Sequence, residues 1–114
     1  MNKFKVGDRV STIPVPSLMQ YGVYGESAIV PDAVTYYPEN LSAPEGAAIW
    51  MPYITAYGAL VEYGQVKAAD MVLITAASSS VSYAAIQIVK AAQATAIVTT
   101  RSKLGVDLPA FPTR

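Results

Sequence analysis

The spacing of apolar residues divides the chain into a strand-rich first part and a helix-rich second part. Three short runs, residues 9–13, 24–30 and 34–37, are rich in residues that favour strands, and glycine and proline separate them. We therefore expect residues 1–41 to form strands and loops.

Two helices are predicted after residue 41. Ser42 and Glu45 fit a capping box, in which the serine side chain bonds the third helical amide and the glutamate reaches back. That helix should run towards Trp50. A second helix is predicted over residues 54–63 from its apolar stripe, with Gly64 suited to the left-handed position after its end.

The clearest pattern comes next, as a strand, a turn of small residues, a helix and a second strand. Residues 71–75 are continuously apolar, as expected of a parallel strand buried on both faces. From Val81 to Ala92 the apolar positions recur at helical spacing, and a strand is predicted over residues 95–99. This order is that of a βαβ unit, so the predicted fold class is α/β.

Length and composition limit what such a chain does. Its 114 residues give room for one modest domain, but not for two complete lobes around a cleft. Hydrophobic residues make up 53% and charged residues 14%, which predicts a packed chain. Eight basic and eight acidic residues balance, so we expect neither nucleic acid nor an anionic membrane as partner.

Missing residue types exclude several kinds of chemistry. The chain has no cysteine and no histidine, which rules out disulfides, thiolate nucleophiles, imidazole bases and the usual zinc sites. The N-terminus lacks the apolar core of a signal peptide, and no stretch is long enough to span a bilayer. A cytoplasmic location is therefore expected.

The turn at residues 75–82 is the best candidate binding site. Such a turn directs backbone amides and the positive end of a helix dipole towards one point, as in dinucleotide pyrophosphate sites. Its composition argues the other way, because it has none of the three glycines of the usual fingerprint. From the residues alone, a nucleotide site and an ordinary connection capped by serines both stay open.

The same turn resembles a known family. Residues 72–81, with residues 84–88 after them, resemble the serine-type cofactor loop of zinc-independent, quinone-oxidoreductase-like members of the medium-chain dehydrogenase/reductase superfamily. Further similar segments follow in the order that the family shows: residues 4–10, 24–26, 38–42, 45–48 and 55–60. The resemblance covers residues 4–103.

This resemblance implies three parts. Residues 1–41 would be a β-rich remnant of a GroES-like domain, and residues 42–66 would be connecting helices. Residues 67–114 would be a truncated Rossmann βαβ unit with a small parallel sheet and a tail. Both domains would be cut, so the segments that supply most catalytic groups would be absent.

The resemblance also implies where a cofactor would lie. Thr55 matches a threonine beside the nicotinamide end, although a buried hydroxyl near a helix start is an equal alternative. Ser79, Ser80 and Val81 match the loop whose amides meet the pyrophosphate.

Two residues after the second strand imply NADPH as the nucleotide. Arg101 and Ser102 match positions that hold the 2′-phosphate in NADPH-preferring relatives. A guanidinium suits a phosphate dianion, and no acidic residue occupies the strand end where an NAD enzyme binds the ribose diol. The alternative for Arg101 is a solvated surface charge.

Departures from the family pattern matter as well. Met51 stands where zinc-dependent relatives place a cysteine, so no zinc is expected. Ala69, Ser82 and Gln93 stand where the family usually has glycine. A side chain at Ser82 should push helix and strand apart or rotate into the phosphate space, so we expect NADPH binding to be weak or absent.

Two functions follow from these observations. One is a truncated NADPH-dependent oxidoreductase that is not catalytic as an isolated chain, with no catalytic residue assigned. The other, favoured for this chain alone, is a non-enzymatic remnant that serves oligomerisation or partner binding. An open, apolar edge on strand 71–75 predicts a homodimer or higher homo-oligomer through that strand or its flanking helices.

Overall fold

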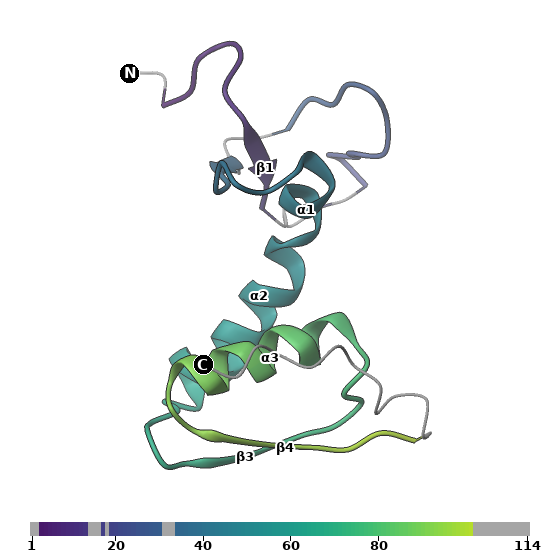
Figure 1. Ribbon diagram of the computed structural model, residues 1–114. Coiled ribbons are helices and arrows are strands. Elements are labelled where there is room, and N and C mark those ends of the chain that lie inside the picture. Colours follow the sequence, from purple (N-terminus) through teal and green to yellow (C-terminus); the bar gives the residue numbers. More distant parts are fainter. Residues whose placement is uncertain (1–2, 14–16, 18, 31–33, 102–114) are drawn as a thin grey trace. The chain divides into compact units, whose positions relative to one another are not determined.

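The computed structural model describes residues 3–13, 17, 19–30 and 34–101 (Figure 1). The chain divides into two compact units, an N-terminal unit, Met1–Met51, and a C-terminal unit, Pro52–Arg114. Within the described ranges, no helix is both long enough and apolar enough to cross a membrane.

The N-terminal unit is built on a two-stranded antiparallel sheet and one short helix. Strand β1, Val10–Thr12, pairs with β2, Val34–Tyr36. Helix α1, Ala43–Ala48, follows. The buried hydroxyl of Ser11 donates a hydrogen bond to the carbonyl of Gly46, which ties α1 to β1. The strands predicted over residues 9–13 and 34–37 are confirmed.

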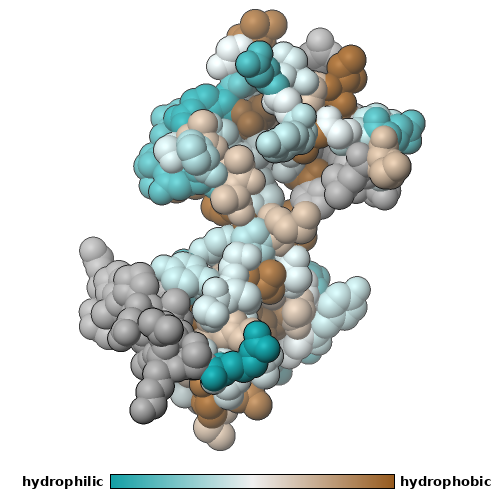
Figure 2. Space-filling model, turned by 90° about the vertical axis from the view of Figure 1, so that its right-hand side faces the viewer, coloured by the Kyte–Doolittle hydropathy of each residue, from teal (hydrophilic) through white to brown (hydrophobic). Residues whose placement is uncertain are grey.

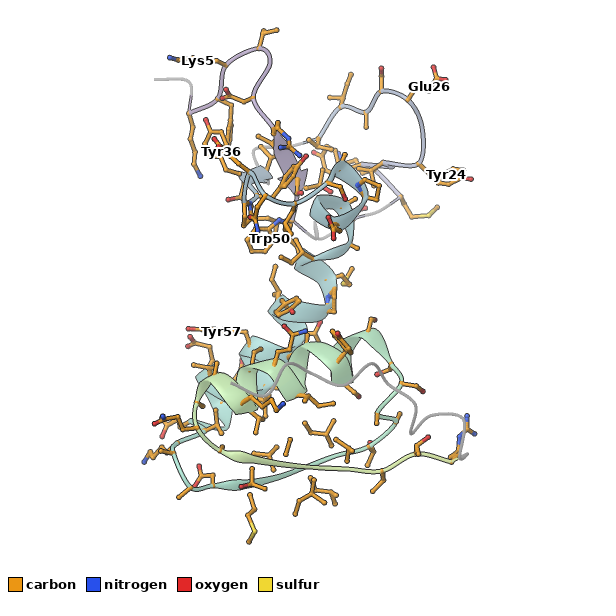
Figure 3. All side chains as sticks on the ribbon, viewed as in Figure 1. Lys5, Tyr24, Glu26, Tyr36, Trp50 and Tyr57 are labelled. Carbon is orange, nitrogen blue, oxygen red and sulfur yellow. The ribbon has the colours of Figure 1, made fainter. Side chains whose placement is uncertain are left out.

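The third strand predicted in this unit is wrong. Residues 24–30 form bends and loop, and the sheet contains β1 and β2 alone among the described residues. Tyr24 and Glu26 project away from the rest of the unit (Figure 3). A strand needs a paired neighbour to satisfy its backbone groups, and propensity within this run does not supply one.

The predicted capping box forms at the start of α1. One carboxylate oxygen of Glu45 accepts hydrogen bonds from the hydroxyl of Ser42, over 2.6 Å, and from its amide, over 2.8 Å. These hydrogen bonds, above all the one from the hydroxyl, hold the pKa of Glu45 below its ordinary value. They fix the first turn of α1.

One arginine holds the segment between β2 and α1. The guanidinium of Arg9 lies 4.9 Å from the ring centroid of Tyr37 and donates to its hydroxyl. It also donates to the carbonyls of Glu39, over 3.1 Å, and Leu41, over 2.6 Å. A Cβ atom at Gly46 would lie 2.7 Å from the Tyr37 ring, so this ring packs directly on α1.

A helix predicted over residues 54–63 is confirmed, but it starts earlier and changes type. Helix α2, Trp50–Tyr57, continues as a π-helix, η1, Gly58–Tyr63. Gly64 has a φ of −78°, so its predicted left-handed conformation is wrong. A Cβ atom there would lie 2.9 Å from the carbonyl oxygen of Ala59, so glycine permits a close approach that closes the π-turn.

The predicted βαβ unit is confirmed. Strand β3, Met71–Ile74, pairs in parallel with β4, Thr95–Val98, and α3, Ser80–Ala91, connects them. Helix α3 covers one face of the sheet (Figure 1). The buried core of this unit consists of small and branched apolar side chains: Ala56, Ile74, Ala84, Ala85, Ile86 and Val89.

The opposite face of the sheet is exposed among the described residues. Met71 is 77% exposed and Leu73 is 65% exposed, so the prediction that this strand is buried on both faces is wrong. Hydrophobic residues reach the surface at the bottom of Figure 2, the level at which β3 and β4 lie in Figure 1. The α3 face alone is packed because Val72 and Ile74 alternate with these two residues.

Candidate functional site

The turn from β3 to α3 is held by backbone hydrogen bonds at both ends. Ala76 adopts the left-handed conformation with a φ of +53°, and its carbonyl accepts from the amide of Ser79 over 2.9 Å. Ala77 is buried, and its amide donates to the carbonyl of Thr99 over 3.0 Å. The turn is therefore fastened to the chain that follows β4.

Two serine side chains form a network at the start of α3. The hydroxyl of Ser79, the N-cap residue, accepts from the amide of Ser82 over 3.2 Å and donates to its hydroxyl over 2.9 Å. The Ser82 hydroxyl donates in turn to the carbonyl of Thr75 over 2.8 Å. Ser82 is 7% exposed, so this network is largely shielded from water.

This arrangement of Ser82 differs from both expected ones. The sequence predicted a side chain that separates helix and strand or enters the phosphate space. The hydroxyl is instead directed back to the strand end, at the Thr75 carbonyl. A polar side chain is tolerated there because each of its hydrogen-bonding groups has a partner.

Two backbone amides remain available at this helix end. The first helical bond runs from the amide of Tyr83 to the carbonyl of Ser79. The amides of Ser80 and Val81 precede it and have no acceptor among the described residues. Both residues are exposed. Free amides and the dipole of a 12-residue helix favour an anion at this point.

Thr55 lies on a different element from the turn. It is an exposed residue of α2, so the alternative of a buried hydroxyl does not hold. Its neighbour Ala56 is buried in the core, and the hydroxyl of Tyr53 donates to Gln87 of α3 over 2.8 Å. These contacts fix α2 against α3 within the C-terminal unit.

Arg101 lies at the same edge of the sheet as the turn. The amide of Thr99, two residues earlier, donates to the carbonyl of Ile74 over 3.0 Å, which joins the carboxyl ends of β4 and β3. Ligands of open α/β sheets bind at this edge. Arg101 is exposed. Ser102, predicted beside it, lies outside the described residues.

The part that Ser82 plays was not predicted from the sequence, in which this serine is a departure that weakens the site. The structure places it in the capping network. The signal was its spacing of three from Ser79, which is the spacing between an N-cap residue and the amide that it bonds. The left-handed Ala76 had no such signal, because alanine disfavours that conformation.

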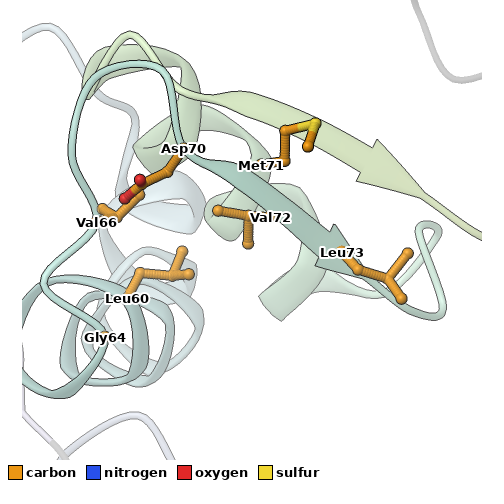
Figure 4. A pocket seen from close by; sticks show the side chains of 7 residues that line it. All are labelled: Leu60, Gly64, Val66, Asp70, Met71, Val72 and Leu73. Atoms are coloured by element: carbon orange, nitrogen blue, oxygen red, sulfur yellow. The ribbon is translucent and has the colours of Figure 1, made fainter.

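A cavity of about 370 Å³ opens on the side of β3 that faces away from β4 (Figure 4). Its lining comes from the end of η1, the following segment and β3: Leu60, Gly64, Val66, Asp70, Met71, Val72 and Leu73. Polar and apolar atoms contribute about equally to its surface, and Asp70 is the one charged residue in the lining. Within the described ranges, no cluster of three or more acidic side chains is placed to hold a metal ion.

Comparisons with known proteins connect this geometry to a family. No family model matches the chain. The quinone oxidoreductase of Homo sapiens is 46% identical over 89 residues, which are 77% of this chain and 26% of that protein. This chain spans about a quarter of the length of the curated relatives that it matches.

Solved structures agree with the sequence comparison. The quinone oxidoreductase from Thermus thermophilus, solved alone and in complex with NADPH, matches with a TM-score of 0.62 at 29% identity, over 69% of this chain and 26% of that chain. The JamJ enoyl reductase in its apo form matches with a TM-score of 0.62 at 32% identity, over 70% of this chain and 24% of that chain. The chain belongs to the medium-chain dehydrogenase/reductase superfamily, as a quinone-oxidoreductase-like member.

Proposed function

We propose that the turn between β3 and α3 binds the pyrophosphate of NADPH, as the cofactor-binding part of a quinone-oxidoreductase-like reductase. One observation carries this proposal: the amides of Ser80 and Val81 have no acceptor among the described residues and lie at the positive end of α3. The similar Thermus thermophilus protein forms a complex with NADPH.

Other residues would orient the nucleotide. Arg101, with Ser102, would hold the 2′-phosphate, because a guanidinium pairs with a phosphate through charge-assisted hydrogen bonds. Thr55 would lie towards the nicotinamide end. Bound NADPH supplies a hydride. This chain by itself binds and orients NADPH and does not reduce a substrate.

The test is a titration of the 114-residue chain with NADPH, followed by nucleotide fluorescence or by a thermal shift. The expectation of weak or absent binding assumed that the Ser82 side chain interferes with the site. Because its hydroxyl instead bonds the Thr75 carbonyl, saturable binding at micromolar concentration is expected. The variant Ser80→Pro removes one free amide at the first helical position, where proline is tolerated. Ser79 before it has an extended backbone, which suits a following proline.

Ser80→Pro should weaken NADPH binding by about tenfold or more, the loss expected when a hydrogen bond to a charged group is removed. Ser80→Ala is the matched control, because it removes the hydroxyl and keeps the amide. Absence of binding at millimolar NADPH, or equal binding by Ser80→Pro and the unmodified chain, contradicts the proposal.

A second candidate function, self-association, rests on the free edge of β3, the edge that pairs with no other strand among the described residues. The carbonyls of Asp70 and Ile74 accept from Thr95 and Thr99, so alternate residues of β3 direct their backbone groups towards β4. The amides and carbonyls of Met71 and Leu73 therefore point away from β4. This edge has no charged residue or proline within β3.

We propose that this edge pairs with a second copy of the chain in a closed homodimer. The exposed side chains of Met71 and Leu73 provide apolar surface for the contact. Light scattering coupled to gel filtration tests the assembly. A monodisperse species with the monomer mass of 12.1 kDa at micromolar concentration excludes it.

A further inference from the structure

We infer that Ser82 is a positioning residue for the cofactor turn, an inference that rests on the proposed NADPH function. Its hydroxyl joins three parts of the turn: the end of β3 through the Thr75 carbonyl, the helix cap through the Ser79 hydroxyl, and its own helix.

The left-handed residue between these groups makes this connection important. Ala76 has a φ of +53°, a left-handed conformation that is sterically unfavourable for alanine. Such a conformation persists only where the surrounding bonds enforce it. The Ser82 hydroxyl holds Thr75 on one side of Ala76, and the Ser79 amide bonds the Ala76 carbonyl on the other.

The network also determines which groups face a ligand. The Ser79 hydroxyl both donates to and accepts from Ser82, and the Ser79 amide is bonded to Ala76. Ser79 therefore has no free amide to offer a phosphate in this conformation. The amides of Ser80 and Val81 are left for the pyrophosphate, and the Ser82 side chain is turned to Thr75 and away from them.

The direction in which NADPH affinity changes distinguishes this role from the simpler alternative that Ser82 obstructs the site. If Ser82 obstructs the phosphate, then Ser82→Gly and Ser82→Ala tighten NADPH binding. If it positions the turn, both variants weaken binding, because the turn loses its tie to the strand. We expect both to weaken NADPH binding by about tenfold, the size of coupling common within one hydrogen-bond network.

A double-mutant cycle shows whether Ser82 affects NADPH binding through its hydrogen bonds with Ser79. Ser79→Ala should weaken binding as Ser82→Ala does, and the double variant should be no weaker than either single one. Because Ser79 is exposed, its variant keeps the fold even if Ser82→Ala does not. Thr95→Ala is the control: it removes an exposed hydroxyl at the other end of the sheet and should change nothing.

Amide hydrogen exchange tests the same role without NADPH. In Ser82→Ala, the amides of Ser79 and of residue 82 should exchange about tenfold faster, while those of Ile86 and Val89 keep their protection. If the unmodified chain does not bind NADPH, the proposed function fails and exchange alone decides the role of Ser82. Protection lost evenly along α3, unchanged exchange in the turn, or NADPH binding that is unchanged or tighter in Ser82→Ala overturns the inference.

Discussion

The amide of Ala69 donates a hydrogen bond to the carbonyl of Gln93 over 3.2 Å, and both residues have a left-handed backbone, with φ of +71° and +59°. Ala69 is the third residue of a turn closed by the Asp70 amide on the Lys67 carbonyl. Family resemblance places glycine at both positions. The left-handed backbone explains the family's glycines at these positions, because glycine adopts this conformation without steric cost.

Glycine at these two positions should stabilise the chain. Gln93 follows the end of α3, where its amide bonds the Lys90 carbonyl and the Ala94 amide bonds the Val89 carbonyl, as in a Schellman motif. Ala69→Gly and Gln93→Gly should each raise the free energy of unfolding by about 1 kcal/mol.

Urea denaturation followed by circular dichroism measures this change. Ala68→Gly is the control, since Ala68 lies in the same turn without a left-handed backbone and should gain nothing. A loss of stability in both Ala69→Gly and Gln93→Gly would show that the left-handed strain is not released.

Arg101 should give preference for NADPH over NADH. Arg101 follows β4 at the edge of the sheet where the nucleotide is proposed to bind, and only NADPH carries a 2′-phosphate. Arg101→Ala should remove the preference, with NADPH affinity falling about tenfold and NADH affinity unchanged. Lys67→Ala, which removes a positive charge near the opposite end of β3, should keep it. Equal affinities of the unmodified chain for both nucleotides refute the assignment.

Self-association should depend on the free edge of β3. Leu73→Lys places a charge at the centre of this edge, where desolvation on pairing becomes costly. The oligomer should dissociate to a folded monomer, seen as a fall in mass by light scattering with an unchanged circular dichroism spectrum. Val6→Lys, at an exposed valine of the N-terminal unit, should keep the oligomer. An unchanged mass in Leu73→Lys means that another surface mediates assembly.

Two glycines should respond in opposite ways to alanine. In Gly46→Ala the new methyl group would lie 2.7 Å from the Tyr37 ring, which Arg9 holds in place, so stability should fall by about 1–3 kcal/mol. Gly58 has no atom within 4 Å of such a methyl group, so Gly58→Ala should gain about 0.5–1 kcal/mol. Thermal unfolding of both variants provides the measurement, and equal effects would contradict the packing at Tyr37.

Acid should weaken the N-terminal unit through Asp8. Its carboxylate accepts hydrogen bonds from the Lys5 amide over 2.8 Å and from the Tyr36 hydroxyl over 2.7 Å. These hydrogen bonds, above all the one from Lys5, hold the pKa of Asp8 below its ordinary value. A lowered folded pKa stabilises the fold above the unfolded pKa, and this stabilisation is lost as pH falls through the folded pKa.

Asp8→Asn should therefore flatten the decline of stability from neutral pH into the acid range. Unfolding followed by Trp50 fluorescence at a series of pH values tests this expectation. Parallel curves for Asp8→Asn and the unmodified chain would assign the acid sensitivity to other carboxylates.

Local sequence determined the elements whose bonds are formed within a few residues. The capping box of Ser42 and Glu45, the helical stripe that becomes α3 and the strands that flank it were predictable, because periodicity and capping act over at most one or two turns. The order of strand, helix and strand also placed the serine turn, and with it the candidate site, between β3 and α3.

Tertiary structure alone decided the rest, because those features depend on groups distant along the chain. Residues 24–30 have strand-like composition but pair with no strand in the part of the chain that the structure describes. Gly64 is required by a carbonyl oxygen of η1 and not by its own backbone conformation. The sequence showed a serine at position 82 where glycine was expected. Only the Thr75 carbonyl and the Ser79 hydroxyl, brought within hydrogen-bond distance by the fold, decide that its side chain closes the turn.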